Sequence, residues 1–166
     1  MANKVNLQTG RFKYNDGGWY VGQHCGDGKR HGQGIYTYPN GDVFDGSFIM
    51  GKREGHGSYK YSAGGRYEGD WKNDCMHGKG KFVYRSGNVY EGDWSNDVPH
   101  GKGNFIEGNI IYDIVHDNGT ETLRQRNESK TQSAGGQQSG EKGWFSAFNF
   151  CGPTAGPGPC GGGRKD

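Results

Sequence analysis

Four polar side chains recur at a fixed spacing and are the first candidates for chemistry: His31, Glu54, His77 and His100, each 23 residues after the last. Histidine and glutamate are both zinc ligands, and a zinc–nitrogen bond is about 2 Å long. If each residue lies in its own β-hairpin, neighbours in this column are two strands, or about 10 Å, apart. Two of them cannot then share one ion, so we expect no metal site. We expect these side chains to hold the adjoining tight turns by hydrogen bonds.

Two further patterns suggest catalysis at first sight. The glycine-rich segment from Gly26 to Gly34 has the composition of a phosphate-binding loop, but it lacks the Gly-Lys-Ser/Thr ending and no helical pattern follows it. Asp70 and Asp93 occupy equivalent positions, so they are copies of one residue rather than an acid–base pair. No serine lies in a nucleophile-elbow pattern. We therefore expect no enzymatic activity and no cofactor.

The spacing of these residues belongs to an internal repeat. The segment Tyr67-Glu-Gly-Asp-Trp71 returns as Tyr90-Glu-Gly-Asp-Trp94, and Phe44-Asp-Gly-Ser-Phe48 precedes both in the same register. Partial units flank the complete ones, so the repeat extends over residues 10–119. Two glycine columns and one aromatic column follow the histidine column: Gly32, Gly55, Gly78 and Gly101; Gly34, Gly57, Gly80 and Gly103; and Tyr36, Tyr59, Phe82 and Phe105.

The composition excludes helical folds. The 166 residues include 34 glycines, and 13% of them are aromatic. Leucine occurs only as Leu7 and Leu123, whereas helix bundles need a leucine-rich stripe. No stretch has the pattern of a long amphipathic helix, so an α/β enzyme is also excluded.

Alternation within each unit predicts β-strands. In the segment from Tyr67 to Trp71, the two rings and Gly69 lie on one face, and Glu68 and Asp70 lie on the other. Turn residues separate such segments, which is typical of a β-meander. The glycines share the face of the rings, because only a residue without Cβ lets a ring lie flat on the backbone. The sequence therefore predicts an all-β fold, a single elongated and twisted antiparallel sheet of tandem β-hairpins.

The repeated pattern, Tyr-x-Gly-x-Trp followed by His-Gly-x-Gly-x-aromatic-x-Tyr, resembles the MORN repeat family over residues 10–119. His24, Glu54 and Glu107 depart from the pattern at single positions. The resemblance implies a row of hairpins in one sheet and a non-enzymatic scaffold. In unit spacing the chain is similar to the repeat regions of radial spoke head proteins and of protist cytoskeletal MORN proteins. That similarity implies a ciliary, flagellar (axonemal) or other cytoskeletal assembly.

A single-layer sheet leaves its ring face partly covered, and exposed apolar strips of that size mark partner sites. We expect an extended or helical protein segment to bind there. The alternative is that the rings only hold the sheet together. The candidate residues of this aromatic strip are Tyr36, Tyr38, Phe48, Tyr59, Tyr61, Trp71, Phe82, Tyr84 and Trp94.

Charge argues against a nucleic-acid partner. Residues 1–119 carry equal numbers of basic and acidic side chains, and the whole chain has a net charge of +2. A neutral surface gains little from anionic lipid or from phosphates. The basic pairs Lys29-Arg30 and Lys52-Arg53 are interpreted as solvated turns. A phospholipid or membrane-surface adaptor, tethered through the tail, is the alternative function.

The composition changes after Gly119. Residues 120–128 are expected to form a short capping helix, and residues 129–166 a glycine-rich flexible tail. Within the tail, an aromatic island at 144–151 is a candidate docking motif and contains Trp144, Phe145, Phe148 and Phe150. Neither a signal-peptide pattern nor a C-x-x-C pair occurs, which favours the cytoplasm. The sequence leaves the oligomeric state open.

Overall fold

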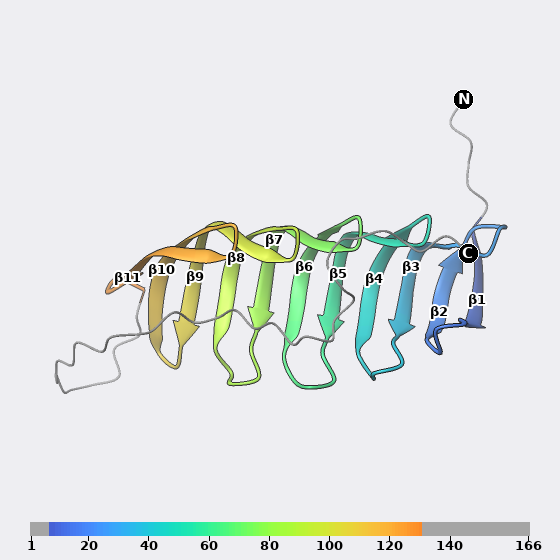
Figure 1. Ribbon diagram of the computed structural model, residues 1–166, viewed down its shortest axis with the longest axis horizontal. Helices are drawn as coiled ribbons and strands as arrows, with labels where there is room; N and C mark the ends of the chain where they lie inside the picture. Colours follow the sequence, from blue (N-terminus) through green and yellow to red (C-terminus); the bar gives the residue numbers. More distant parts are fainter. Residues whose placement is uncertain (1–6, 131–166) are drawn as a thin grey trace, which may run out of the picture.

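The computed structural model describes residues 7–130, which form one antiparallel sheet of eleven strands in sequential order (Figure 1). No helix occurs within these residues. The predicted all-β fold of tandem hairpins is confirmed. The strands are β1 (Gln8–Lys13), β2 (Trp19–His24), β3 (Arg30–Thr37), β4 (Val43–Ile49), β5 (Lys52–Lys60), β6 (Arg66–Lys72), β7 (Cys75–Val83), β8 (Val89–Ser95), β9 (Val98–Glu107), β10 (Ile110–Asp117) and β11 (Thr120–Arg126).

Two-residue turns join successive strands at one end of the hairpins. Asn73 and Asp74 join β6 to β7 with φ of +50° and +71°, and Asn96 and Asp97 join β8 to β9 in the same way. Positive φ at both positions defines the type I′ turn, whose twist matches that of antiparallel strands. Each such turn also bonds to the preceding unit: the Asp74 amide donates to the Arg53 carbonyl at 3.1 Å. The turns therefore connect neighbouring units as well as neighbouring strands.

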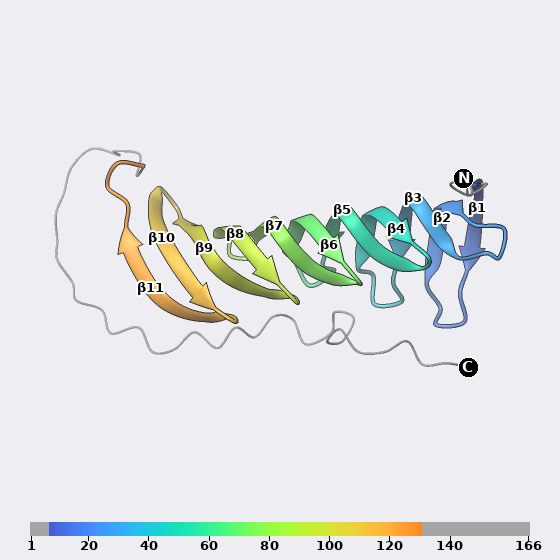
Figure 2. The same ribbon diagram turned by 90° about the horizontal axis from the view of Figure 1, so that it is seen from above.

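The strands in the middle of the sheet are strongly bent along their length (Figures 1 and 2). Residues four apart on a straight strand are about 13 Å apart. On β6, however, the ring centroids of Tyr67 and Trp71 are 5.3 Å apart, and those of Phe44 and Phe48 on β4 are 5.1 Å apart. The two limbs of the bent sheet thus enclose a core between them.

Facing glycines make the bend possible. Gly69 on β6 pairs with Gly80 on β7, and the register shifts immediately after Gly69. A Cβ added at Gly69 would lie 2.5 Å from the Gly80 Cα, and one added at Gly80 would lie 2.5 Å from Cε2 of Tyr67. The predicted packing of rings against glycine backbone is confirmed. The register shift leaves Gly78 and Lys79 of β7 without partners on β6, and such local irregularities of a ladder bend the strand that carries them.

The expected capping helix at 120–128 is wrong, because Thr120–Arg126 forms β11 and pairs with β10. Asn118 and Gly119 have φ of +47° and +83°, which form another tight hairpin turn. A helix of nine residues is marginal in isolation, whereas β11 completes the hydrogen bonds of an otherwise open β10 edge. The aromatic island with Trp144, Phe145, Phe148 and Phe150 lies outside the described residues. In the described part, no helix is long and apolar enough to span a membrane.

Candidate functional site

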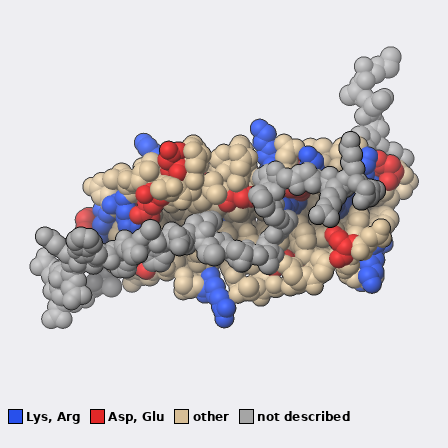
Figure 3. All heavy atoms as spheres, in the orientation of Figure 1, with Lys and Arg blue, Asp and Glu red and all other residues tan. Residues whose placement is uncertain are grey.

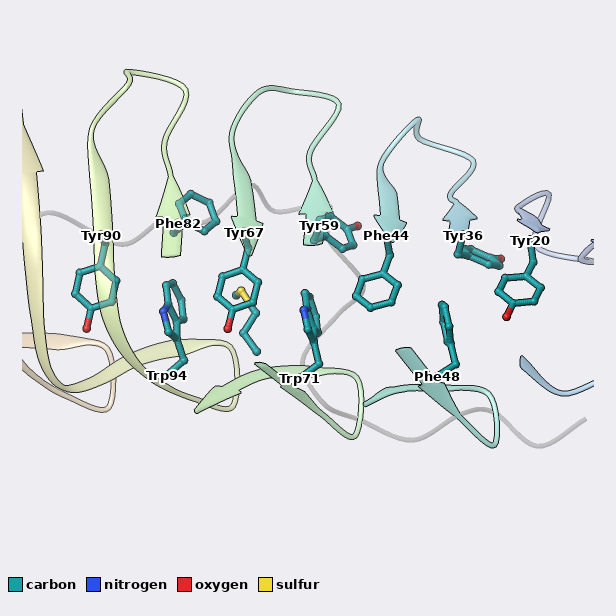
Figure 4. Close-up of a cluster of buried hydrophobic side chains, with 11 residues drawn as sticks. Tyr20, Tyr36, Phe44, Phe48, Tyr59, Tyr67, Trp71, Phe82, Tyr90 and Trp94 are labelled. Carbon is teal, nitrogen blue, oxygen red and sulfur yellow. The ribbon is translucent and has the colours of Figure 1, made fainter. Parts of the chain in front are cut away.

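Six rings of the predicted aromatic strip belong to the hydrophobic core (Figure 4). Their exposed fractions lie between 1% and 6%. The expectation that these rings are accessible on an open face is therefore wrong. The physical reason is the bend. The two limbs of the bent sheet lie on either side of the rings, so a single sheet covers the rings from both sides. The six buried residues are Tyr36, Phe48, Tyr59, Trp71, Phe82 and Trp94.

The polar atoms of the buried rings bind backbone carbonyls. The Tyr67 hydroxyl donates to the Asp70 carbonyl at 3.0 Å, which holds the two limbs of β6 together. The Trp71 indole donates to the Gly57 carbonyl at 3.1 Å, and the equivalent Trp94 indole donates to Gly80 at 3.1 Å. Since buried polar atoms are costly when unpaired, these bonds fix the ring positions.

Loop carboxylates bind two further buried tyrosines. The Tyr36 hydroxyl donates to Asp16 at 2.6 Å, and this bond holds the pKa of the Asp16 carboxyl below its usual value. The Tyr59 hydroxyl donates to Asp42 at 2.7 Å. Burial alone would raise the pKa of Asp42, but its hydrogen bonds from Ser62, Tyr59 and Asn40 outweigh burial and lower it. These carboxylates therefore have a structural role.

The remaining three residues of the strip, Tyr38, Tyr61 and Tyr84, are only partly buried and are named here the tyrosine row. Tyr38 packs on Tyr59 with ring centroids 5.5 Å apart, and Tyr61 and Tyr84 pack in the same way on the next rings. Within residues 7–130, none of their three hydroxyls has a hydrogen-bond partner. Burial raises the pKa of Tyr84 to about 12, so its hydroxyl stays protonated and able to donate.

Two arginines that pack on rings of the core, the buried Arg53 and the partly buried Arg30, were missed by sequence reasoning. Arg53 is 4% exposed, and its guanidinium carbon lies 4.3 Å from the Trp71 ring centroid. It also pairs with Asp74 of the next turn. Arg30 lies 4.6 Å from the Tyr36 ring centroid and donates to the Gly51 carbonyl. The interpretation of Arg30 and Arg53 as solvated turn residues is therefore wrong.

A signal for the inward position of these two arginines was present in the repeat. The positions equivalent to Arg30 and Arg53 in the later units are Met76 and Pro99, and both are buried. Apolar residues in the same column indicate an inward position, where a cation must be paired and stacked on rings.

Three of the four residues in the polar column singled out first hold the tight turns, as predicted; among the described residues, His77 makes no such hydrogen bond. Glu54 Oε2 accepts a hydrogen bond from the Asn73 amide at 2.7 Å. His31 Nδ1 accepts from Met50 at 3.5 Å, and His100 Nδ1 accepts from Asn118 at 3.4 Å. Among the described residues, no three His, Cys, Asp or Glu side chains converge as a metal site would require.

A histidine lies at each end of the row of buried rings. His24 and His116 take the strand position that Phe48, Trp71 and Trp94 hold in the middle units. The His24 ring packs edge-on against Phe12 at 4.7 Å, and the His116 ring packs against Tyr90 at 5.2 Å. Burial lowers the pKa of His116, and its Nδ1 is buried without a hydrogen-bond partner among the described residues.

Charges are interspersed on the outer face, which is the face opposite the rings. Lys81 lies 4.0 Å from Glu91, and Lys79 pairs with Asp93. Figure 3 shows both basic and acidic side chains on the visible part of one face. This part of the sheet therefore presents no field of a single sign.

The bent sheet, the glycine pairs and the enclosed rings define the class of the protein: a tandem β-hairpin repeat protein. A family model described as the MORN repeat matches residues 27–43, 44–66, 67–89 and 90–106. Residues 27–106 therefore consist of MORN repeats. No curated protein matches the chain.

Proposed function

We propose that this MORN-repeat protein is a non-enzymatic scaffold or adaptor that binds a protein partner through the tyrosine row, Tyr38, Tyr61 and Tyr84. One observation carries the proposal. The hydroxyls of the buried tyrosines Tyr36 and Tyr59 donate to carboxylates, whereas the three hydroxyls of the tyrosine row have no hydrogen-bond partner within the described chain. Tyrosines that present a ring and a free donor are favoured at protein interfaces.

The spacing of the tyrosine row favours an extended partner. Successive members lie two strands apart, which corresponds to about 9.6 Å. A polyproline II segment has three residues per turn and advances about 9.3 Å per turn, so every third side chain meets a tyrosine. Its backbone carbonyls have no internal hydrogen bonds and can accept from the tyrosine hydroxyls. The partner segment therefore repeats its apolar contacts every third residue.

The proposed setting is the cytoplasm, in a ciliary, flagellar (axonemal) or other cytoskeletal assembly. The similarity of the unit spacing to radial spoke head proteins and protist cytoskeletal MORN proteins supports this setting. A rigid sheet suits such a role, because adjacent units are joined by turn hydrogen bonds such as that between Asp74 and Arg53.

The test replaces only the three hydroxyls. Affinity purification is run in parallel with the full chain and with a Tyr38→Phe, Tyr61→Phe, Tyr84→Phe variant, and recovered proteins are quantified by mass spectrometry. We expect one partner to be lost with the variant, whose melting temperature stays unchanged because the deleted hydroxyls have no internal partner. Equal recovery of every protein by both chains contradicts the proposal. Recovery of phospholipid alone would support the membrane-surface adaptor instead.

A further inference from the structure

The outer face of β2 and β3 carries three exposed apolar side chains close together. Trp19, Val21 and Ile35 are 40%, 49% and 43% exposed. Val21 on β2 lies directly opposite Ile35 on β3, and Trp19 occupies the next outward position on β2. We name these three side chains, with their neighbours Arg11 and Lys13 on β1, the N-terminal outer patch.

The repeat itself shows that the fold does not require apolar residues at Val21 and Ile35. The pair Val21 and Ile35 corresponds to Glu68 and Lys81 in a later unit, which face each other in the same register. The pair formed by Asp45 and Ser58 is equivalent as well. Since the same backbone carries polar pairs at these sites, the exposed apolar side chains are not explained by folding. Contiguous exposed apolar side chains mark interaction sites.

Two cations border the patch without a counter-ion. The Arg11 guanidinium carbon lies 4.7 Å from the Trp19 ring centroid, and the Lys13 Nζ lies 5.6 Å from it. Within residues 7–130, neither side chain forms an ion pair. Lys79 and Lys81 on the same face do pair with carboxylates. The first carboxylate on the outer face is Asp45, at the far side of Ile35 on β4.

We propose that the N-terminal outer patch binds a protein segment that presents apolar side chains next to carboxylates. The apolar side chains cover Val21, Ile35 and the ring of Trp19, and the carboxylates pair with Arg11 and Lys13. Charge complementarity favours this partner, because Arg11 and Lys13 have no carboxylate partner in the described part of the chain, whereas Lys79 and Lys81 on the same face already pair with carboxylates. A membrane is disfavoured, since lipid recognition by charge uses clusters of roughly four to eight basic residues.

This site is independent of the tyrosine row. Tyr20 and Tyr36 alternate with the patch residues along β2 and β3 and are buried on the opposite face. The two surfaces therefore lie on opposite sides of one sheet, and both can be occupied at once. A protein with two such surfaces joins two partners.

The test uses a variant that the repeat supplies. Val21→Glu with Ile35→Lys copies the pair of Glu68 and Lys81, so the variant is compatible with the sheet. A displayed library of random peptides is selected on the full chain, and the enriched peptides are synthesised and titrated. We expect enriched peptides to combine Asp or Glu with large apolar residues, and to bind the variant at least about tenfold more weakly. The Tyr38→Phe, Tyr61→Phe, Tyr84→Phe variant should bind them as the parent does.

Several results overturn the proposal. These are the absence of enriched peptides, enrichment without acidic residues, or equal affinity for the parent and the variant. Vesicles of phosphatidylcholine and phosphatidylserine provide the other arm, because binding that the variant abolishes would assign the patch to membranes. If the first variant fails to fold, Val21→Asp with Ile35→Ser copies the pair of Asp45 and Ser58 and serves in its place. Loss of binding in the tyrosine variant alone would assign the peptides to the tyrosine row and would overturn this proposal.

Discussion

The indole nitrogen of Trp71 donates a hydrogen bond to the carbonyl of Gly57, 14 residues earlier and in the preceding strand. Trp94 makes the same bond to Gly80 in the next unit. Each bond joins the far limb of one strand to the bend of its neighbour. The units therefore support one another in series, as expected for repeat proteins whose stability comes from nearest-neighbour contacts.

The bond of Trp71 predicts a large effect on stability. We expect Trp71→Ala to lower the free energy of unfolding by about 3–5 kcal/mol, because it removes a buried ring and leaves a cavity in the core. Urea denaturation measures the change. Trp19→Ala is the matched control, since Trp19 is 40% exposed and its loss should cost well under 1 kcal/mol by comparison. Similar costs for the two variants would contradict the enclosed core.

The glycine pairs at the bend predict intolerance of any larger side chain. We expect Gly80→Val to destabilise by about 1–3 kcal/mol or more, because the added atoms overlap the Tyr67 ring. Gly26→Ala should be nearly neutral, since an added Cβ meets nothing within 4 Å. Gly87→Ala separates space from backbone strain, because its site is open but its φ is +90°. Thermal melts rank the three variants, and a Gly80→Val protein that melts like the parent would refute the ring-on-backbone packing.

We expect that an apolar side chain of similar size can replace the buried Arg53. Arg53 Nη1 is buried without a hydrogen-bond partner among the described residues, and the equivalent residue of the next unit is Met76. We expect Arg53→Met to change the free energy of unfolding by less than about 1 kcal/mol, or to raise it, because a buried ion pair gains little over apolar packing. Arg53→Ala should cost about 2–4 kcal/mol, since it leaves a cavity under Trp71. Chemical denaturation compares them, and a methionine variant as unstable as the alanine variant would show that the charge itself is required.

The buried His116 predicts a loss of stability in mild acid. Burial lowers its pKa in the folded state below the ordinary 6.5 of the unfolded chain, so the unfolded state binds the proton more readily. The contribution of His116 is therefore complete above pH about 6.5 and decreases as the pH falls below that value. His116→Phe should remove this part of the pH dependence. Urea midpoints measured across the window test it, and an NMR titration that places the His116 pKa above 6.5 would contradict the sign.

Much of the architecture was readable from the sequence because it depends on local periodicity. The 23-residue period and the alternation from Tyr67 to Trp71 were enough to predict strands, hairpins and the shared face of rings and glycines. The role of Glu54 at the turn also followed from its column. These features need only the rule that neighbouring side chains on a strand point to opposite faces.

Other features depend on contacts between segments that alternation does not specify. Alternation assigns Trp71 to a face, but only the bend of β6 decides that this face is enclosed. The same bend buries Arg53 under a ring and leaves Tyr61 at the rim. Residues 120–126 form a strand because pairing with β10 satisfies the backbone hydrogen-bond groups along its open edge. A short helix at the same place would leave those groups unpaired. Burial is a property of the folded surface, and curvature of a sheet is set by its bulges and packing rather than by the side-chain pattern of any one strand.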